Sequence, residues 1–121
     1  MFLVETNRVK RLLHLSFIGK VSAADLERGG DEVQALLKEL PPGFVLLTDL
    51  SRLETMEVAC GKQIGRTMDW CRQHGVGKIV RVVPDPTKDI GLNILSIFHY
   101  EPGMRVITCE NLTQAERHLA A

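Results

Sequence analysis

Short apolar segments of strand length alternate with longer amphipathic segments along this chain. Phe44–Leu47 and Lys78–Val83 are the clearest apolar runs, and their aliphatic, β-branched composition is typical of strands that are covered on both faces. Between them, apolar residues recur at the three- to four-residue spacing of a helix: Cys60, Ile64, Met68 and Cys71. Strand, helix and strand in this order predict a right-handed crossover that joins two parallel strands.

The N-terminal third predicts a hairpin followed by a helix. Phe2–Thr6 and Val9–Ile18 have strand patterns, with a turn at Asn7–Arg8 between them and a stop at Gly19–Lys20. The next helix extends from its N-cap Ser22 to Leu40, where Pro41-Pro42-Gly43 ends it. Because two adjacent glycines disfavour a helix, Gly29-Gly30 predicts a kink or a split, with Asp31 capping the second half.

The C-terminal part continues the alternation. A helix is predicted from its N-cap Thr87 through Lys88 to about Phe98 or Tyr100, then a strand over Met104–Cys109 and a last helix from Asn111 to near Ala120. The predicted fold class is therefore α/β, with a mixed, mainly parallel sheet of about five strands in β-β-α-β-α-β-α-β-α order. The length of 121 residues predicts a single domain over residues 1–121.

Composition narrows the classes of function. Fifteen basic residues balance fifteen acidic ones, so no large field of one sign favours nucleic acid or an anionic membrane. No apolar run approaches the ~18–20 residues that cross a bilayer, and no signal-peptide core is present, which predicts a cytoplasmic protein without a transmembrane segment. The three cysteines form no CxxC motif. Cys60 lies near a helix start, where a reactive thiol is one interpretation, but its place in the apolar stripe favours a core residue.

Polar residues gather where the first buried run ends. We expect an exposed loop over Thr48–Glu57, since ligands and partners of such folds meet the carboxyl ends of the strands. Its candidate interaction or phosphorylation residues are Asp49, Ser51, Thr55 and Glu57. Ser51 and Glu54 also have capping-box spacing, so local capping is the alternative. A second predicted loop adds Asp85 and Thr87, for which ordinary turn chemistry is the alternative.

The segment Asp49-Leu50-Ser51-Arg52-Leu53, which follows the apolar run, resembles the signature strand and loop of the STAS family, the sulfate transporter and anti-sigma factor antagonist domains. The predicted order of elements is similar to that fold over essentially the full chain. The resemblance implies a regulatory module that a partner kinase phosphorylates on a serine at the next helix start, which switches binding to an anti-sigma factor.

The match departs from the family at the phosphorylated position. A gap-free match places Glu57 on the acidic position, Ala59 on the phosphoacceptor and Cys60 on a glycine. Since alanine has no hydroxyl, only Ser51 or Thr55 remains as a substitute in this segment. The chain is therefore similar to divergent STAS-like proteins, which are grouped with a lipid-binding fold.

No catalytic constellation, metal-ligand spacing or cofactor motif is present, which predicts a non-enzyme without metal or cofactor. The favoured function is a non-catalytic protein-interaction or regulatory module with a protein partner of kinase or sigma-regulator type. The alternative is a small-ligand or lipid-binding carrier; a receiver-type phosphoaspartate at Asp49 ranks below both. A homodimer through the apolar helix at Ile90–Phe98, with His99 and Tyr100 at its rim, is a further hypothesis.

Overall fold

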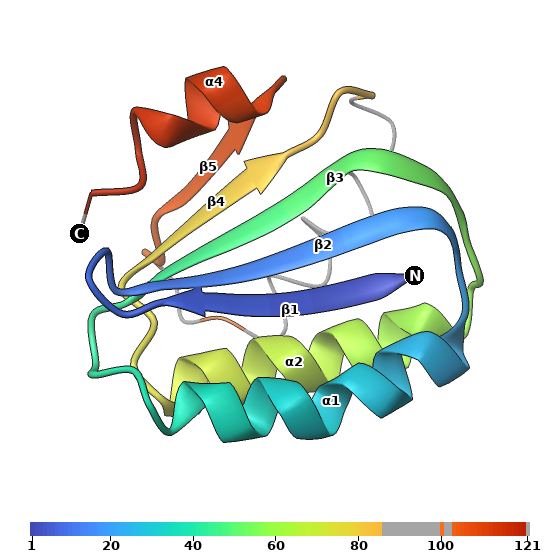
Figure 1. The fold of residues 1–121 in the computed structure, drawn as a ribbon, viewed down its shortest axis with the longest axis horizontal. Coiled ribbons are helices and arrows are strands. Elements are labelled where there is room, and N and C mark those ends of the chain that lie inside the picture. The colour runs from blue at the N-terminus through green and yellow to red at the C-terminus, as the bar shows by residue number, and fades with distance from the viewer. Residues whose placement is uncertain (86–99, 101–102, 121) are drawn as a thin grey trace.

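A five-stranded sheet runs through the middle of the molecule, in the order β1-β2-β3-β4-β5 (Figure 1). The computed structural model describes residues 1–85, 100 and 103–120. The elements are β1 (Phe2–Asn7), β2 (Leu12–Val21), α1 (Ala23–Leu37), β3 (Val45–Met56), α2 (Cys60–Gln73), β4 (Lys78–Val82), β5 (Val106–Cys109) and α4 (Leu112–Glu116). β1 is antiparallel to β2 and all other neighbours are parallel, which confirms the predicted mixed, mainly parallel sheet.

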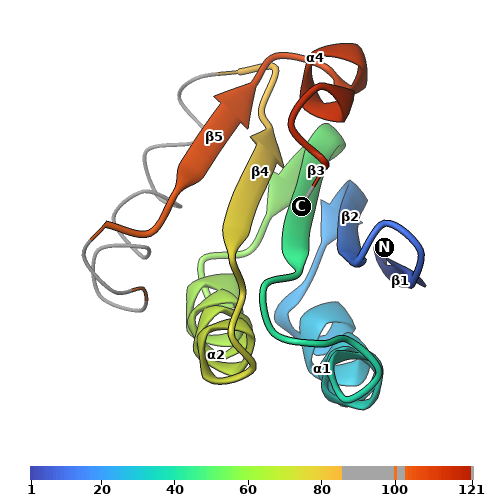
Figure 2. The same cartoon turned by 90° about the vertical axis from the view of Figure 1, so that its left-hand side faces the viewer.

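The helices cover the two faces of the sheet unequally. α1 and α2 lie side by side against one face, and the short α4 lies on the other, over the β4–β5 end (Figure 2). Thr87 and the apolar helix that the sequence predicts after it lie outside the described residues. None of the described helices is long and apolar enough to cross a membrane.

The first hairpin is shifted from its predicted position. Its turn occupies residues 8–11, so β2 begins at Leu12 rather than Val9. The Asn7 carboxamide oxygen accepts a hydrogen bond from the Lys10 amide at 3.0 Å and holds this turn. At the other end, β2 continues through Gly19 to Val21, because two register shifts against β3 absorb the irregularity and Gly19 adopts a φ of 65°.

Helix α1 is continuous where the sequence predicted a break. Its N-cap is Ser22, as predicted, and Ser22 forms a reciprocal capping box with Asp25. Gly29 and Gly30 do not split the helix, and Asp31 lies within it rather than at a second N-cap; both glycines are buried. A Cβ on Gly29 would lie 2.3 Å from the Phe2 ring, and one on Gly30 would lie 3.2 Å from the Trp70 ring. The glycines therefore allow β1 and α2 to approach the helix.

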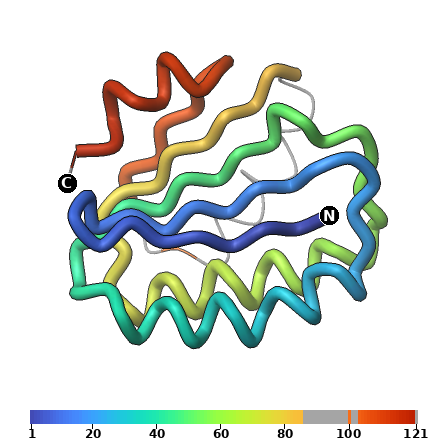
Figure 3. Tube along the Cα trace, viewed as in Figure 1, coloured from blue at the N-terminus to red at the C-terminus, as the bar shows by residue number. Residues whose placement is uncertain are grey.

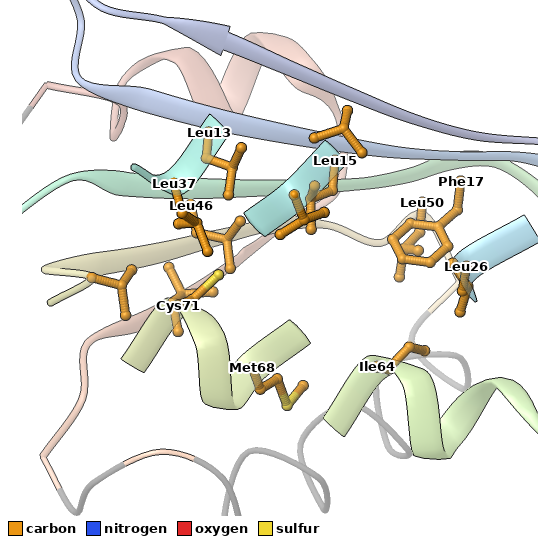
Figure 4. Packing of buried hydrophobic residues seen from close by; sticks show 14 of the residues in the cluster. Leu13, Leu15, Phe17, Leu26, Leu37, Leu46, Leu50, Ile64, Met68 and Cys71 are labelled. Atoms are coloured by element: carbon orange, nitrogen blue, oxygen red, sulfur yellow. The ribbon is translucent and has the colours of Figure 1, made fainter. Parts of the chain in front are cut away.

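Two apolar clusters fill the space on either side of the sheet. The larger one joins β2 and β3 to α1 and α2 (Figure 4), with the labelled residues Leu13, Leu15, Phe17, Leu26, Leu37, Leu46, Leu50, Ile64, Met68 and Cys71. Tyr100 is also buried in this cluster and not at an exposed rim. The smaller cluster packs the opposite face against α4 through Ala115 and Leu119. The predicted apolar stripe of α2 is thus confirmed as core.

Apart from β3, which extends to Met56, the element ends differ from the sequence predictions by a few residues. α2 covers Cys60–Gln73, β5 begins at Val106 rather than Met104, and α4 ends at Glu116 rather than near Ala120. The Asn111 side chain caps α4 by accepting from the Gln114 amide at 2.9 Å, as its spacing predicted. Only the ends move, since each predicted element covered by the described residues is present.

Candidate functional site

The segment expected to be an exposed loop after Leu47 is the second half of a strand. β3 extends to Met56, and Thr48, Asp49 and Leu50 are buried. The predicted loop and the Ser51–Glu54 capping box are therefore wrong. The strand continues because Ile18–Val21 of β2 pair with Arg52–Met56, across register shifts that no local pattern reveals. The exposed corner lies further along the chain, between β3 and α2.

Asp49 lies on the α4 side of the sheet and is only 3% exposed. One of its carboxylate oxygens accepts a hydrogen bond from the Ser51 backbone amide at 2.9 Å. Its neighbour in β2 is Ser16, which is also buried and whose hydroxyl lies 3.2 Å from the Nε2 atom of His14. The sequence analysis singled out Asp49 but missed its neighbours Ser16 and His14, although two polar residues inside an apolar strand were a visible signal. Because Asp49 is buried, its side chain is not a surface contact of the folded protein.

The candidate hydroxyls, by contrast, are accessible. Ser51 and Thr55 are both exposed on the part of β3 that extends beyond its pairing with β4, which ends at Asp49. In the described residues this extension pairs with β2 alone. Ser51 thus contacts Asp49 through its backbone amide. Thr55 lies near the end of β3, close in sequence to the start of α2.

Residues 55–59 form the corner between β3 and α2, which we call the β3–α2 corner. Glu57 links this corner to the neighbouring helix: its amide donates to the Val21 carbonyl at 3.1 Å, and its carboxylate accepts from the Ala23 amide at 2.9 Å. That carboxylate lies at the N-terminus of α1, where it meets the positive end of the helix dipole. The functional candidate Glu57 therefore also has a structural role.

The start of α2 is exposed and carries no side-chain cap. Val58 is 99% exposed and Ala59 is exposed. The first amides of the helix, those of Cys60 and Gly61, donate to the carbonyls of Glu57 and Val58 at 3.0 and 3.1 Å. The position that the STAS resemblance aligns with a phosphoacceptor is thus at an accessible helix start, as that resemblance implies, but its side chain is a methyl group.

The thiol at this helix start does not suit nucleophilic chemistry. Cys60 is fully buried, and its sulfur lies 3.7 Å from the Val21 carbonyl oxygen. Burial raises the pKa of the Cys60 thiol, and the nearby negative charge of Glu57 raises it further. The interpretation of Cys60 as a core residue is confirmed, and that of a reactive thiol is wrong.

Asp85 is exposed three residues after the end of β4. Because Val82 pairs with Asp49, Asp85 follows a strand that ends at the same edge of the sheet as the β3–α2 corner. The second loop residue, Thr87, is not among the described residues. Within the described ranges, no group of three His, Cys, Asp or Glu side chains is arranged to hold a metal ion.

A small cavity lies between the sheet and α2. Its volume is about 30 Å³, and its lining is apolar apart from Thr48, Thr67, Arg81 and Tyr100. Arg81 is 2% exposed and comes from the middle of β4. Ligand pockets for drug-sized molecules enclose ~300–1,000 Å³. As bounded by the described residues, this cavity has room for about one water molecule.

Three solved structures have the same arrangement over nearly the whole chain. An uncharacterized protein from the DUF3478 family of Shewanella loihica, with a SpoIIAA-like fold, superposes with a TM-score of 0.70 at 14% identity, covering 99% of this chain and 93% of its own. The phosphorylated form of the Bacillus cell fate determinant SpoIIAA gives 0.67 at 11%, covering 98% and 99%. The chain has a SpoIIAA-like fold. An anti-sigma factor antagonist from Mycobacterium paratuberculosis gives 0.60 at 19%, covering 98% and 92%.

The SpoIIAA-like fold is the STAS-like fold that the element order and the Asp49–Leu53 segment predicted from the sequence. Neither a protein-family model nor a curated protein sequence matches the chain. The likeness that the comparisons show therefore lies in the arrangement of the elements.

Proposed function

We propose that this protein is a non-catalytic regulatory module that binds a protein partner through the β3–α2 corner. The observation that carries the proposal is the accessible start of α2, where Val58 is 99% exposed and is followed by exposed Ala59. Single exposed apolar residues are common on protein surfaces. This one stands beside the position that the STAS resemblance assigns to partner control, in a fold shared with anti-sigma factor antagonists.

The chemistry of the corner favours binding that phosphorylation at position 59 does not control. Ala59 has no hydroxyl group, so a kinase has no acceptor there. Ser51 and Thr55 keep exposed hydroxyls on β3 and remain the candidate phosphoacceptors, and Asp85 adds a carboxylate after β4. A partner kinase or sigma regulator of the type that the resemblance implies therefore either binds a surface that phosphorylation does not control, or acts where a hydroxyl stands at another position, Ser51 or Thr55.

A photo-crosslinking experiment tests the docking surface. A photoreactive phenylalanine analogue is placed at position 58 and, as the control, at position 112, where Leu112 is 41% exposed on the opposite face of the sheet. In cells of the source organism, we expect position 58 to capture a protein that position 112 does not. The purified partner then binds the wild-type chain, and Val58→Asp weakens it by about tenfold or more while Leu112→Asp does not.

Equal crosslinking at both positions, or a partner that binds Val58→Asp and the wild type equally, would overturn the proposal. Circular dichroism of each variant shows that the fold is intact. The carrier function has less support, because the cavity under the sheet encloses about 30 Å³. A bound small molecule that survives into native mass spectrometry would favour the carrier instead.

A further inference from the structure

A cleft lies at the opposite end of the molecule from the β3–α2 corner. It separates the turn between β1 and β2 from the chain that follows α4, which run close together in Figures 1 and 3. Its volume is about 510 Å³, within the ~300–1,000 Å³ typical of ligand sites. The lining residues are Val9, Lys10, Arg11, Glu116, Leu119 and Ala120, and we call this site the basic cleft.

Positive side chains continue from the cleft along the rim where the parallel strands begin. The Arg11 carbonyl accepts from the Val45 amide at 2.9 Å, Val45 pairs with Lys78, and the Ile79 amide donates to the Arg105 carbonyl at 2.9 Å. Arg11, Lys78 and Arg105 therefore mark the starts of β2, β4 and β5. Neighbouring strands are ~4.8 Å apart, so Lys78 and Arg105 mark adjacent strands, and Arg11 lies two strands from Lys78 because β3 stands between them.

Within the described residues, the hydrogen bonds of these cations go to backbone carbonyls. Arg11 donates to the Pro42 carbonyl and Lys78 to the Ala120 carbonyl, at 2.6 and 2.7 Å. In the part of the chain that the structure describes, none of Lys10, Arg11, Lys78 and Arg105 has a carboxylate in ion-pair distance. Partial burial and then the positive charge of Arg105 lower the pKa of Lys78. Glu116 is the acidic residue among those that line the cleft.

The cleft also has an apolar side. Val9 is 95% exposed at the tip of the turn, and Leu119 belongs to the core cluster beneath α4. Lys10 and Arg11, which form no ion pair among the described residues, stand beside an exposed valine, and this arrangement is complementary to a segment that carries both carboxylates and an apolar residue. Nucleic acid is a poorer match, because single strands bind through stacking on aromatic side chains and none of the described residues that line the cleft is aromatic.

We propose that the basic cleft binds an acidic peptide segment of a partner protein, with carboxylates facing Lys10 and Arg11 and an apolar side chain against Val9. This site is separate from the β3–α2 corner. Its occupation does not depend on Val58.

Fluorescence anisotropy with a labelled peptide tests the site. The probe is an eight-residue peptide of alternating glutamate–aspartate pairs and leucines, and its matched control has glutamine and asparagine in place of the acids. We expect the acidic peptide to bind at low salt and the neutral peptide to bind with an affinity at least about tenfold lower. Added salt should weaken binding of the acidic peptide.

Charge-reversal variants locate the binding. Lys10→Glu lowers the affinity for the acidic peptide by about tenfold. Lys62→Glu, an exposed lysine in the first turn of α2, changes the net charge equally and leaves affinity within about twofold. Val9→Ser lowers the affinity for both peptides, and Val58→Asp leaves the affinity for each peptide unchanged.

Equal binding of the two peptides, or equal loss in Lys10→Glu and Lys62→Glu, would show that only the overall charge matters and would overturn the proposal. Tighter binding of a 15-nucleotide oligothymidine than of the acidic peptide would assign the cleft to nucleic acid instead. Circular dichroism confirms that each variant is folded.

Discussion

Three cysteine side chains lie in the core, and their protonation follows from that position. Cys60 and Cys71 are fully buried and Cys109 is 5% exposed. Burial raises the pKa of all three thiols, that of Cys71 to about 12. A thiolate is the reactive form, so these side chains stay protonated and unreactive in the folded protein at neutral pH.

We therefore expect the native protein to resist labelling by a thiol reagent at pH 8 and to label at all three cysteines in denaturant. The unfolded Cys71 thiol ionises near pH 9 and the folded one near 12. Above pH 9 the unfolded state alone loses this proton, so the free energy of unfolding falls as the pH rises from 9 towards 12. Ellman assays with and without denaturant measure the labelling. Rapid stoichiometric labelling before unfolding would contradict the placement of the thiols.

Gly29 offers a second test at the level of one side chain. A Cβ there meets the Phe2 ring at 2.3 Å, and that ring packs 5.0 Å from the ring of Phe17. Gly29→Ala gains ~1 kcal/mol of helix propensity, but displacing the ring costs about 1–3 kcal/mol, so the expected net loss is up to about 2 kcal/mol. With Phe2→Ala in place, the same change becomes stabilising.

The matched control for Gly29→Ala is Gly61→Ala in the first turn of α2, where a Cβ meets no atom within 4 Å. Gly61→Ala should raise the free energy of unfolding by about 0.5–1 kcal/mol. Urea unfolding of the four variants measures these changes. A stabilising Gly29→Ala in the wild-type background would mean that the Phe2 ring moves aside without cost.

At the scale of elements, the N-terminus of α1 is held from two directions. The Ser22 hydroxyl accepts from the Asp25 amide at 3.1 Å, and the Asp25 carboxylate accepts from the Ser22 amide at 3.0 Å. The hydrogen bond from the Ser22 amide is the main cause that lowers the pKa of Asp25. Glu57 adds a third bond from the far side of the β3–α2 corner.

Ser22→Ala removes one of these bonds and should cost about 1 kcal/mol in the free energy of unfolding. It should also raise the pKa of Asp25 towards 3.8, since the serine hydroxyl contributes to the lowering. Because the folded pKa of Asp25 is the lower one, its contribution is present above pH 4 and is lost on acidification. Urea unfolding and a carboxyl NMR titration give the two values. An unchanged Asp25 titration would show that the hydroxyl is not its partner.

Sequence patterns predicted the elements well, because each signal used is local. The Ser22 and Asn111 caps and the apolar helix stripes depend on residues within a few positions of one another. The errors arise where distant segments decide the structure. Gly29 and Gly30 look like helix breakers until Phe2 and Trp70 pack on them.

The candidate site was predicted less well for the same reason. The polar second half of β3 looks like a loop until the bulged end of β2 pairs with it. Asp49 is buried as a result, whereas the exposed hydroxyls of Ser51 and Thr55 were predicted. Val58 carried no signal in the sequence, because its exposure depends on where β3 ends and α2 begins.

For the whole molecule, zero net charge conceals an uneven distribution. The balance of fifteen against fifteen excludes a large overall field, but the fold brings Lys10, Arg11, Lys78 and Arg105 to the end where the parallel strands begin. The β3–α2 corner lies at the other end. The two surfaces that we propose as binding sites, one with an exposed valine at a helix start and one with several cations, therefore lie at opposite ends of the molecule.

The two apolar clusters share one sheet, which predicts that the described part of the molecule unfolds as a unit. Leu37 lies in the cluster with α1 and α2, and Leu119 lies in the one beneath α4. Leu37→Ala should cost ~2–5 kcal/mol, and Leu119→Ala should fall in the lower part of that range because Leu119 lies at the cluster's edge.

The single tryptophan, Trp70, packs against the α1–α2 side and reports on whether the clusters unfold together. In Leu119→Ala, the change is on the far face of the sheet, yet the Trp70 fluorescence midpoint in urea should fall together with the far-ultraviolet circular dichroism midpoint. A circular dichroism transition that precedes an unshifted Trp70 transition would mean that α4 and its cluster unfold independently. The basic cleft, which α4 and its tail help to form, would then be lost while the β3–α2 corner remained folded.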